Sequence, residues 1–487
     1  MQDQEIQKGE SEAPKRGLRK GDEIKITADA AAFNGGCVGR HEGMAVFLSG
    51  CVPGDQVRAR ISKKRKSYAE ARVQEILSPG EDRIDPRCFY FGDCGGCKWQ
   101  NLDYAAQLRW KRQHVLDAFE RIGKLQDVEI RETIGCDDPY FYRNKMEFSF
   151  GASRWLTDAE IQSGEEFNKD FALGLHAPGR FDKVIDVREC FLQSPESNRI
   201  LNATRDFVLA HDLPPYTTRT HEGMLRNLVV RTSRGTGEIM VALITADDMP
   251  GLIDDYVQHL LEAVPEVTTI VHGINRKKAQ IAFSEEVHVL HGPGTITERI
   301  AGNDFTISPF SFFQTNTAQG EKLYAEALEA AQLDGTGVAW DLYCGTGTIT
   351  LAAAARSESA LGVELNEGSV ADARVNAERN GISNVQFIAG DLKDVIKDLE
   401  EGVAGIERPD VVIVDPPRAG MHEDVVRTLM RFGPERISYV SCNPTTQARD
   451  CGILAEEYTV EYVQPVDMFP QTYHIETVAR LVRKPGL

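Results

Sequence analysis

Two side chains near the C-terminal end of the sequence could together perform covalent catalysis. Cys442 follows a predicted strand within Ser441–Pro444, and Glu476 begins the last predicted strand. A cysteine thiolate is an effective nucleophile, and a partly desolvated carboxylate can act as a general base. A lone cysteine is more often a buried structural thiol, but acidic strand ends around Cys442 favour the catalytic interpretation. Cys344 is the alternative nucleophile, and its place in a glycine-rich loop favours a packing role.

A glycine-rich loop and a series of acidic strand ends predict a nucleotide-like cofactor. Asp341–Thr348 follows an apolar strand and begins a helix, and the next three predicted strands end at Glu364, Asp391 and Asp415. In a doubly wound sheet ligands bind at the carboxyl ends of the strands, where an acid can hold ribose hydroxyls. The pattern favours S-adenosylmethionine. A nicotinamide dinucleotide is disfavoured because Thr350 replaces the third glycine of its fingerprint.

A thiol, a carboxylate and a methyl donor at one sheet edge suit methylation of carbon 5 of uracil. That carbon is a poor nucleophile until a thiolate adds to C6, and Cys442 could supply this thiolate. Glu476 could then remove the proton from C5, so that the thiolate leaves. A cytosine-5 enzyme, an amino methyltransferase and a non-catalytic RNA-binding factor are the alternatives. Arg418 follows Asp-Pro-Pro where amino methyltransferases usually carry an aromatic residue.

Four further cysteines predict a metal centre. Cys88, Cys94 and Cys97 come from one short loop, and Cys190 is the candidate for a fourth ligand. In a cytosolic protein such cysteines stay reduced, so their spacing indicates metal binding rather than disulfides. Zinc and a [4Fe–4S] cluster both accept four thiolates, and the spacing alone leaves both open.

The elements that must position these residues predict a multidomain α/β chain. A length of 487 residues suggests about three domains. Residues 306–487 alternate helix and strand, which predicts an open, mostly parallel, doubly wound Rossmann-like domain. Residues 79–305 predict a central α+β domain with the cysteine loop, whose helix over 103–122 could dock on the C-terminal domain. Residues 18–78 predict a small OB-like β-barrel after a disordered lead-in at 1–17.

The distribution of charged residues indicates whether the chain could bind nucleic acid. The net charge is −19, which argues against a wholly basic nucleic-acid binder. Six basic residues nevertheless gather in the predicted barrel: Arg58, Arg60, Lys63, Lys64, Arg65 and Lys66. Such a cluster can track phosphates because cellular salt screens charges beyond about 8–10 Å, although a solvated hairpin tip is the alternative. No secretory signal or apolar run of about 20 residues is present, which predicts a cytoplasmic protein without membrane contact.

These motifs resemble the bacterial RNA (uracil-5-)-methyltransferases, and especially the iron–sulfur members that modify 23S ribosomal RNA. The resemblance extends from about residue 18 to the end of the chain. It implies that residues 18–78 form a TRAM domain, which binds RNA. It also implies that Cys88, Cys94, Cys97 and Cys190 hold a [4Fe–4S] cluster, with zinc as the less favoured alternative.

The resemblance implies roles for single residues as well. Phe312–Asn316 is similar to the family segment Phe-Phe-Gln-x-Asn, whose glutamine contacts S-adenosylmethionine. The implied cofactor contacts are Gln314, Tyr343, Thr348, Glu364, Asp391 and Asp415. The implied nucleophile is Cys442, and the implied general base is Glu476.

The barrel and the cysteine loop set the chain apart from the shorter transfer-RNA enzymes, so 23S rRNA is the expected substrate and tRNA the alternative. The target base must leave its stack to reach Cys442. The barrel and the central domain would then hold the surrounding RNA through phosphates and stacking. We expect a monomer without a protein partner.

Overall fold

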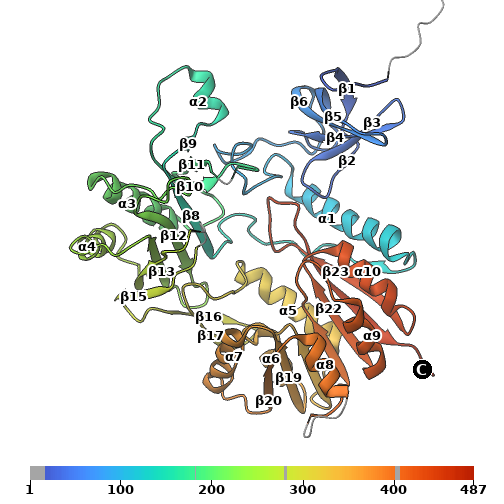
Figure 1. Cartoon of the computed structure of the whole chain (residues 1–487). Coiled ribbons are helices and arrows are strands. Elements are labelled where there is room, and N and C mark those ends of the chain that lie inside the picture. Colours follow the sequence, from blue (N-terminus) through green and yellow to red (C-terminus); the bar gives the residue numbers. More distant parts are fainter. Residues whose placement is uncertain (1–16, 181, 279–281, 401–405, 487) are drawn as a thin grey trace, which may run out of the picture. The chain divides into compact units, whose positions relative to one another are not determined.

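The computed structural model describes residues 17–180, 182–278, 282–400 and 406–486 (Figure 1). The chain divides after Asp85 into two compact units. The lead-in predicted over 1–17 lies, except for its last residue, outside the described residues. The boundary predicted at residue 305 falls inside the second unit and stays a prediction.

The first unit is a curled sheet in the order β1-β5-β6-β4-β3-β2. Its strands are β1 (Glu23–Thr27), β2 (Ala30–Ala31), β3 (Cys37–His41), β4 (Met44–Ser49), β5 (Gln56–Lys64) and β6 (Tyr68–Ser78). Alternate residues of β5, such as Val57, Ala59 and Ile61, are buried, and those between them are exposed. Gly39 of β3 packs against β1, because a Cβ there would lie 2.2 Å from the Thr27 carbonyl oxygen. This contact bends the sheet toward the closed form expected of a small barrel.

The predicted basic cluster lies on β5 and the turn that follows it. Two of its members form ion pairs within the sheet, Arg58 with Glu75 and Lys63 with Glu70. These pairs are exposed, so they neutralise charge without contributing much stability.

The second unit contains a central mixed sheet in the order β15-β14-β13-β12-β8-β10-β11-β9. Its strands are β8 (Lys145–Gly151), β9 (Arg154–Trp155), β10 (Ala172–His176), β11 (Val184–Asp186), β12 (Leu225–Thr232), β13 (Ile239–Thr245), β14 (Thr269–Ile274) and β15 (Glu286–His291). Helices α3 (Pro195–Ala210) and α4 (Ile253–Ala263) share one apolar core with β8 and β12. A hairpin, β16 (Ile296–Ile300) and β17 (Asn303–Ile307), follows this sheet.

The C-terminal sheet of the second unit has the order β20-β19-β18-β21-β22-β24-β23-β7. Its strands are β18 (Val338–Leu342), β19 (Ser359–Glu364), β20 (Val385–Ala389), β21 (Val411–Val414), β22 (Arg436–Ser441), β23 (Tyr458–Val466), β24 (Glu476–Arg483) and β7 (Glu129–Ile130). Only β24 runs antiparallel to its neighbours. The strand order reverses between β18 and β21, where a doubly wound sheet opens a ligand crevice.

Helices cover both faces of this sheet, so the predicted doubly wound domain is confirmed. One core contains α5 (Thr317–Ala331), α6 (Thr348–Ala354) and α7 (Glu367–Arg379). The other contains α8 (Leu392–Glu400), α9 (Glu423–Phe432) and α10 (Pro444–Leu454). In the described part of the chain, no helix is both long and apolar enough to cross a membrane.

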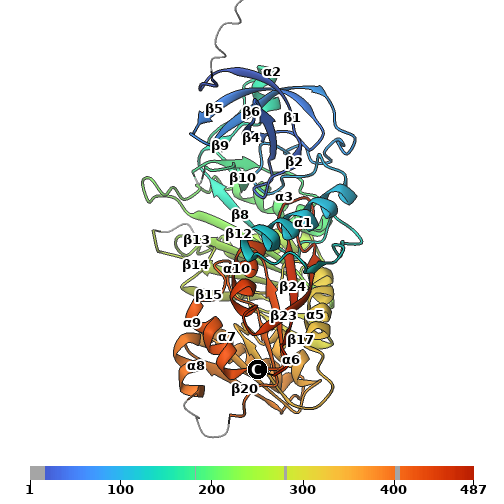
Figure 2. The same cartoon turned by 90° about the vertical axis from the view of Figure 1, so that its right-hand side faces the viewer.

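A segment from before the central sheet joins this second core. Helix α1 (Tyr104–Ala118), which continues as a π turn over Phe119–Gly123, packs on α10 (Figure 2). The two-residue strand β7 then pairs with β23. The helix expected over 103–122 therefore docks on the C-terminal sheet. Its Lys111 is fully buried and forms an ion pair with the equally buried Asp467, which follows β23.

Candidate active site

The carboxyl ends of the C-terminal strands open into a cavity of about 1070 Å³. Seven of the eight residues predicted for the cofactor and catalysis line it: Gln314, Tyr343, Glu364, Asp391, Asp415, Cys442 and Glu476. The eighth, Thr348, lines an adjoining cavity of about 50 Å³ together with Gln314, Tyr343 and Asp415. The structure therefore brings the predicted residues together at the carboxyl ends of the strands, where the sequence placed the ligand site.

The glycine-rich loop after β18 turns through left-handed backbone conformations. Tyr343 has a φ of 69°, which is uncommon for a non-glycine residue and is typical of functional sites. Gly347 has a φ of 83°, and a Cβ there would lie 3.2 Å from Ala373 and Phe387. The N–H of Gly345 donates to the Glu364 carboxylate at 3.1 Å. The loop and the acid that ends β19 are thus held together.

Two neighbours that the sequence did not indicate hold the predicted cofactor contacts Gln314 and Thr348 in place. The buried Tyr324 of α5 accepts a hydrogen bond from the Thr348 hydroxyl at 3.2 Å and also contacts the side chain of Gln314. The Asn144 side chain donates to the Gln314 carbonyl oxygen at 2.9 Å. No sequence motif indicates either contact, so only the folded chain reveals them.

Two buried carboxyl groups, those of Asp341 and Asp415, lie close to the glycine-rich loop. Asp341 is 2% exposed, and burial raises its pKa to about 7. Burial likewise raises the pKa of Asp415 to about 6. The Thr350 hydroxyl donates to one Asp341 oxygen at 2.6 Å, and the other oxygen has no hydrogen-bond partner among the described residues. This free acceptor and the two acids fit a ligand that donates hydrogen bonds and carries positive charge.

Cys442 and Glu476 stand next to each other because of the pairing between β22 and β24. Ser441 is the register partner of Thr477, and the Thr477 hydroxyl donates to the Ser441 carbonyl at 3.0 Å. Cys442, one residue beyond Ser441, therefore lies beside Glu476, one residue before Thr477. Cys442 is half-buried, whereas Glu476 is only 7% exposed.

The surroundings of this pair disfavour charge on either group. Burial, followed by the nearby Glu476 and Asp415 carboxylates, raises the pKa of Cys442 to about 11. Burial and Asp415 likewise raise the pKa of Glu476 well above its usual range. Arg418 opposes both shifts and hydrogen-bonds Cys442. Sequence reasoning used Arg418 only to exclude another enzyme class and missed this role.

The four metal-ligand candidates line a second cavity, of about 430 Å³. Burial raises the pKa of each thiol, to about 11 for Cys94 and about 12 for Cys97, and neighbouring cysteines add to the shifts of Cys88, Cys94 and Cys97. The donor set therefore consists of thiols that are near enough to repel one another as thiolates. Within the described ranges, no three His, Cys, Asp or Glu side chains form a ready-made site for one metal ion.

Comparison with known proteins identifies related chains. The family model for tRNA (uracil-5-)-methyltransferase matches residues 236–484, and the TRAM domain model matches residues 18–74. An RNA methyltransferase of Chlorobaculum tepidum is 44% identical over 466 residues, which cover 95% of this chain and 96% of the relative. One from Bacteroides thetaiotaomicron is 43% identical over 453 residues, which cover 92% and 99%.

A solved structure also matches nearly the whole chain. It is that of the Pyrococcus abyssi tRNA (uracil-54, C5)-methyltransferase in complex with S-adenosyl-L-homocysteine. The TM-score is 0.72 at 26% sequence identity, and the match covers 94% of this chain and 100% of that chain.

The raised pKa of Cys442 predicts slow, pH-dependent alkylation in the ligand-free protein. With a pKa of about 11, the thiolate fraction should rise roughly tenfold per pH unit between pH 7 and 9. The rate at which iodoacetamide modifies the Cys442 peptide, followed by mass spectrometry, should rise in parallel. Arg418→Met should slow it further, because the guanidinium lowers the thiol pKa. A rate that levels off below pH 8 would contradict this assignment.

Proposed function

Because the chain belongs to the tRNA (uracil-5-)-methyltransferase family, we propose that it methylates carbon 5 of a uridine in structured RNA through Cys442 and Glu476. The family and its relatives make the chain an S-adenosylmethionine-dependent RNA methyltransferase. The observation that carries the proposed mechanism is the β22–β24 register, which sets the thiol beside the carboxylate in the wall of one cavity.

When bound, S-adenosylmethionine supplies an electrophilic methyl group on a positively charged sulfur. We assign its contacts to Gln314, Tyr343, Thr348, Glu364, Asp391 and Asp415. Glu364, at the end of β19, is suited to accept the ribose hydroxyls, and the exposed Asp391 to meet the adenine edge. The buried Asp341 and Asp415 favour a cation, and the free oxygen of Asp341 offers an acceptor.

The proposed reaction starts from the ionised forms of both residues, after the Cys442 thiol and the Glu476 carboxyl group have given their protons to water. A positive charge near Asp415 offsets the carboxylates that hold the Cys442 pKa high, and Arg418 stabilises the thiolate. The thiolate adds to C6 of uracil, which places an electron pair on the C5 side of the ring as an enolate, and C5 takes the methyl group. Glu476 then takes the C5 proton, and the C6–S bond breaks with its electron pair returning to sulfur. A carboxylate with a raised pKa is a strong base for this last step.

For the RNA, we propose 23S rRNA as the substrate and tRNA as the alternative. The TRAM domain combined with the cysteine loop supports rRNA, through the resemblance to the iron–sulfur enzymes of that class. The match to the Pyrococcus abyssi tRNA enzyme supports the alternative. In either RNA the uridine must flip out of its stack to enter the cavity. A volume of about 1070 Å³ offers room for a cofactor and a base together.

We also propose that Cys88, Cys94, Cys97 and Cys190 hold a [4Fe–4S] cluster. All four thiols line one cavity, yet they do not converge on a single point. One zinc ion draws its sulfur ligands to about 2.3 Å from a common centre. A cluster instead takes each thiolate at a different iron, so it fits thiols that are spread around a cavity. Zinc remains the alternative occupant.

Methyl transfer can be measured directly with labelled S-adenosylmethionine and either 23S rRNA or tRNA that lacks 5-methyluridine. We expect label in 5-methyluridine of rRNA. Cys442→Ala should abolish it, and Glu476→Gln should lower turnover by roughly 10²–10⁴-fold. Cys344→Ala, which alters the other thiol near the cavity, should keep the transfer and at most weaken cofactor binding.

Two outcomes of that assay would overturn parts of the proposal. If neither RNA acquires labelled 5-methyluridine, the proposed activity is wrong. If Cys442→Ala retains full turnover, the thiolate mechanism is wrong. Label confined to tRNA would select the alternative substrate.

The cluster predicts a brown protein after anaerobic purification, with about four irons and four sulfides per chain. Cys88→Ser should lose the broad visible absorbance and the iron. Cys136→Ser should keep both, because Cys136 contacts the Asp138 carbonyl and does not line the cysteine cavity. One zinc ion per chain in place of iron would contradict the cluster assignment.

A further inference from the structure

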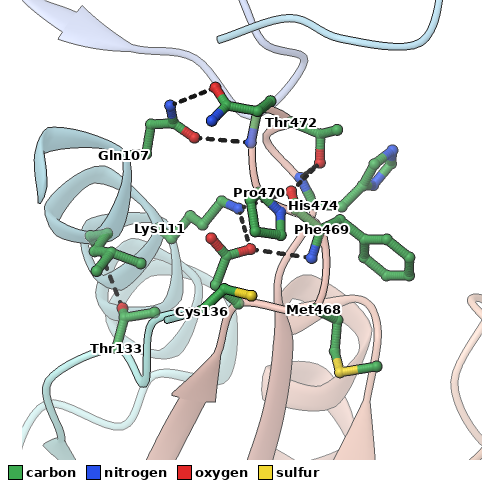
Figure 3. A network of polar contacts seen from close by, with 12 residues as sticks. Gln107, Lys111, Thr133, Cys136, Met468, Phe469, Pro470, Thr472 and His474 are labelled. Carbon is green, nitrogen blue, oxygen red and sulfur yellow. Dashed lines mark hydrogen bonds and ion pairs between the residues drawn. The ribbon is translucent and has the colours of Figure 1, made fainter. Parts of the chain in front are cut away.

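The segment between β23 and β24 delivers Glu476 to the cavity. It spans residues 467–475, and its Phe469, Thr472 and His474 line the cavity together with Glu476. The position of the base therefore depends on how this segment is held. Figure 3 shows that Gln107 and Lys111 of α1 reach toward it.

Gln107 makes reciprocal hydrogen bonds with Gln471 in the middle of this segment. The Gln471 N–H donates to the Gln107 side-chain oxygen at 3.0 Å, and the Gln107 amide nitrogen donates to the Gln471 side-chain oxygen at 3.1 Å. The same nitrogen lies within hydrogen-bond distance of the carbonyls of Trp99, at 3.0 Å, and Leu102, at 2.9 Å. Gln107 is fully buried, so water cannot replace a lost bond cheaply.

The backbone of Gln471 joins the same segment to the cysteine loop. Its carbonyl accepts hydrogen bonds from the N–H groups of Lys98 and Trp99, at 2.9 and 3.0 Å. Lys98 directly follows Cys97, one of the four cysteines that line the second cavity. Two backbone hydrogen bonds thus connect the residues that follow Cys97 directly to the segment.

Gln471 adopts a backbone conformation that its surroundings must enforce. Its φ is 68°, in the left-handed region, and its side chain is 2% exposed. Such a residue keeps this conformation only where neighbouring contacts over-determine it. If the contacts are lost, the segment can relax to an ordinary conformation, and Glu476, five residues further on, would shift with it.

We propose that Gln107 is a positioning residue for the catalytic base, and that through Gln471 it couples the cysteine loop to Glu476. This inference rests on the proposed function. It gives the cysteine loop a defined task in the reaction, because an ordered loop keeps the base in place. A merely structural role for Gln107 would lower stability without singling out the step that needs Glu476.

The distinguishing readout is the covalent adduct between Cys442 and RNA. Once C5 carries the methyl group, the adduct is released only by removal of the C5 proton, so a displaced base should leave the methylated adduct to accumulate. Gln107→Leu should lower kcat at least tenfold, since displacement by about 1 Å can cost up to 10²-fold. It should also raise the fraction of protein that migrates with RNA in denaturing gels, while the KM for S-adenosylmethionine changes less than twofold.

Matched variants separate the possible outcomes. Gln113→Leu alters the same helix, where the Gln113 side chain donates to Asp117 one turn further on at 2.9 Å, and should behave as the wild type. Glu476→Gln should accumulate the adduct. Absence of the adduct in Glu476→Gln, with no methylation by the wild type, would refute the proposed function. Accumulation in Glu476→Gln but wild-type adduct and kcat in Gln107→Leu would refute the positioning role.

Hydrogen exchange tests the coupling without relying on the folding of Gln107→Leu. In Cys97→Ala, the peptide spanning residues 467–475 should exchange faster than in the wild type. The peptide over 444–454, in α10, should not change. Unaltered exchange over 467–475 in a variant whose cysteine loop has loosened would overturn the coupling.

Discussion

The antiparallel pairing of β24 with β22 is the constraint on which the proposed chemistry depends. It inserts the last strand between β22 and β23, so that the start of β24 meets the end of β22 at the cavity. The Thr477 hydroxyl helps to secure the register, because it lies within hydrogen-bond distance of the Ser441 carbonyl oxygen, at 3.0 Å, and of the Gln447 side-chain oxygen, at 2.8 Å. A slip of one residue would turn Glu476 to the opposite face of the sheet. The thiol and the base are therefore neighbours by register, although 34 positions separate Cys442 from Glu476 in the sequence.

The site contains several buried acidic groups, whose charged forms lower the stability of the folded protein. Burial raises the pKa of Asp341 to about 7, from a usual value of 3.8. The folded state therefore binds this proton more tightly than the unfolded chain does, and the associated stability is lost as pH rises between about 4 and 7. In the proposed mechanism, a bound cation would favour the charged forms of the buried acids and lower the pKa of Cys442. The nucleophile would then form when the methyl donor is in place.

The sequence indicates the parts of the fold that depend on local pattern, and it misses those that depend on distant contacts. The strands before Glu364, Asp391 and Asp415 were predicted from apolar runs that end in acids, and the structure contains them as β19, β20 and β21. Strand β7 has only two residues, so no periodicity could place it beside β23. The cofactor contact of Gln314 was predicted through family resemblance alone, because no pattern in the sequence around it indicates a ligand. Arg418 and Gln471 act through tertiary contacts between distant segments, which no local pattern contains.

The most direct test of the central claim uses RNA with 5-fluorouridine at the target position. Fluorine on C5 cannot be removed as a proton, so the reaction should stop with sulfur bonded to C6 and methyl bonded to C5. Incubation with S-adenosylmethionine should give a complex that survives denaturing gels, and peptide mass spectrometry should locate the methylated, fluorinated nucleotide on Cys442. A complex attached through another residue, or methyl transfer without any covalent complex, would contradict the account.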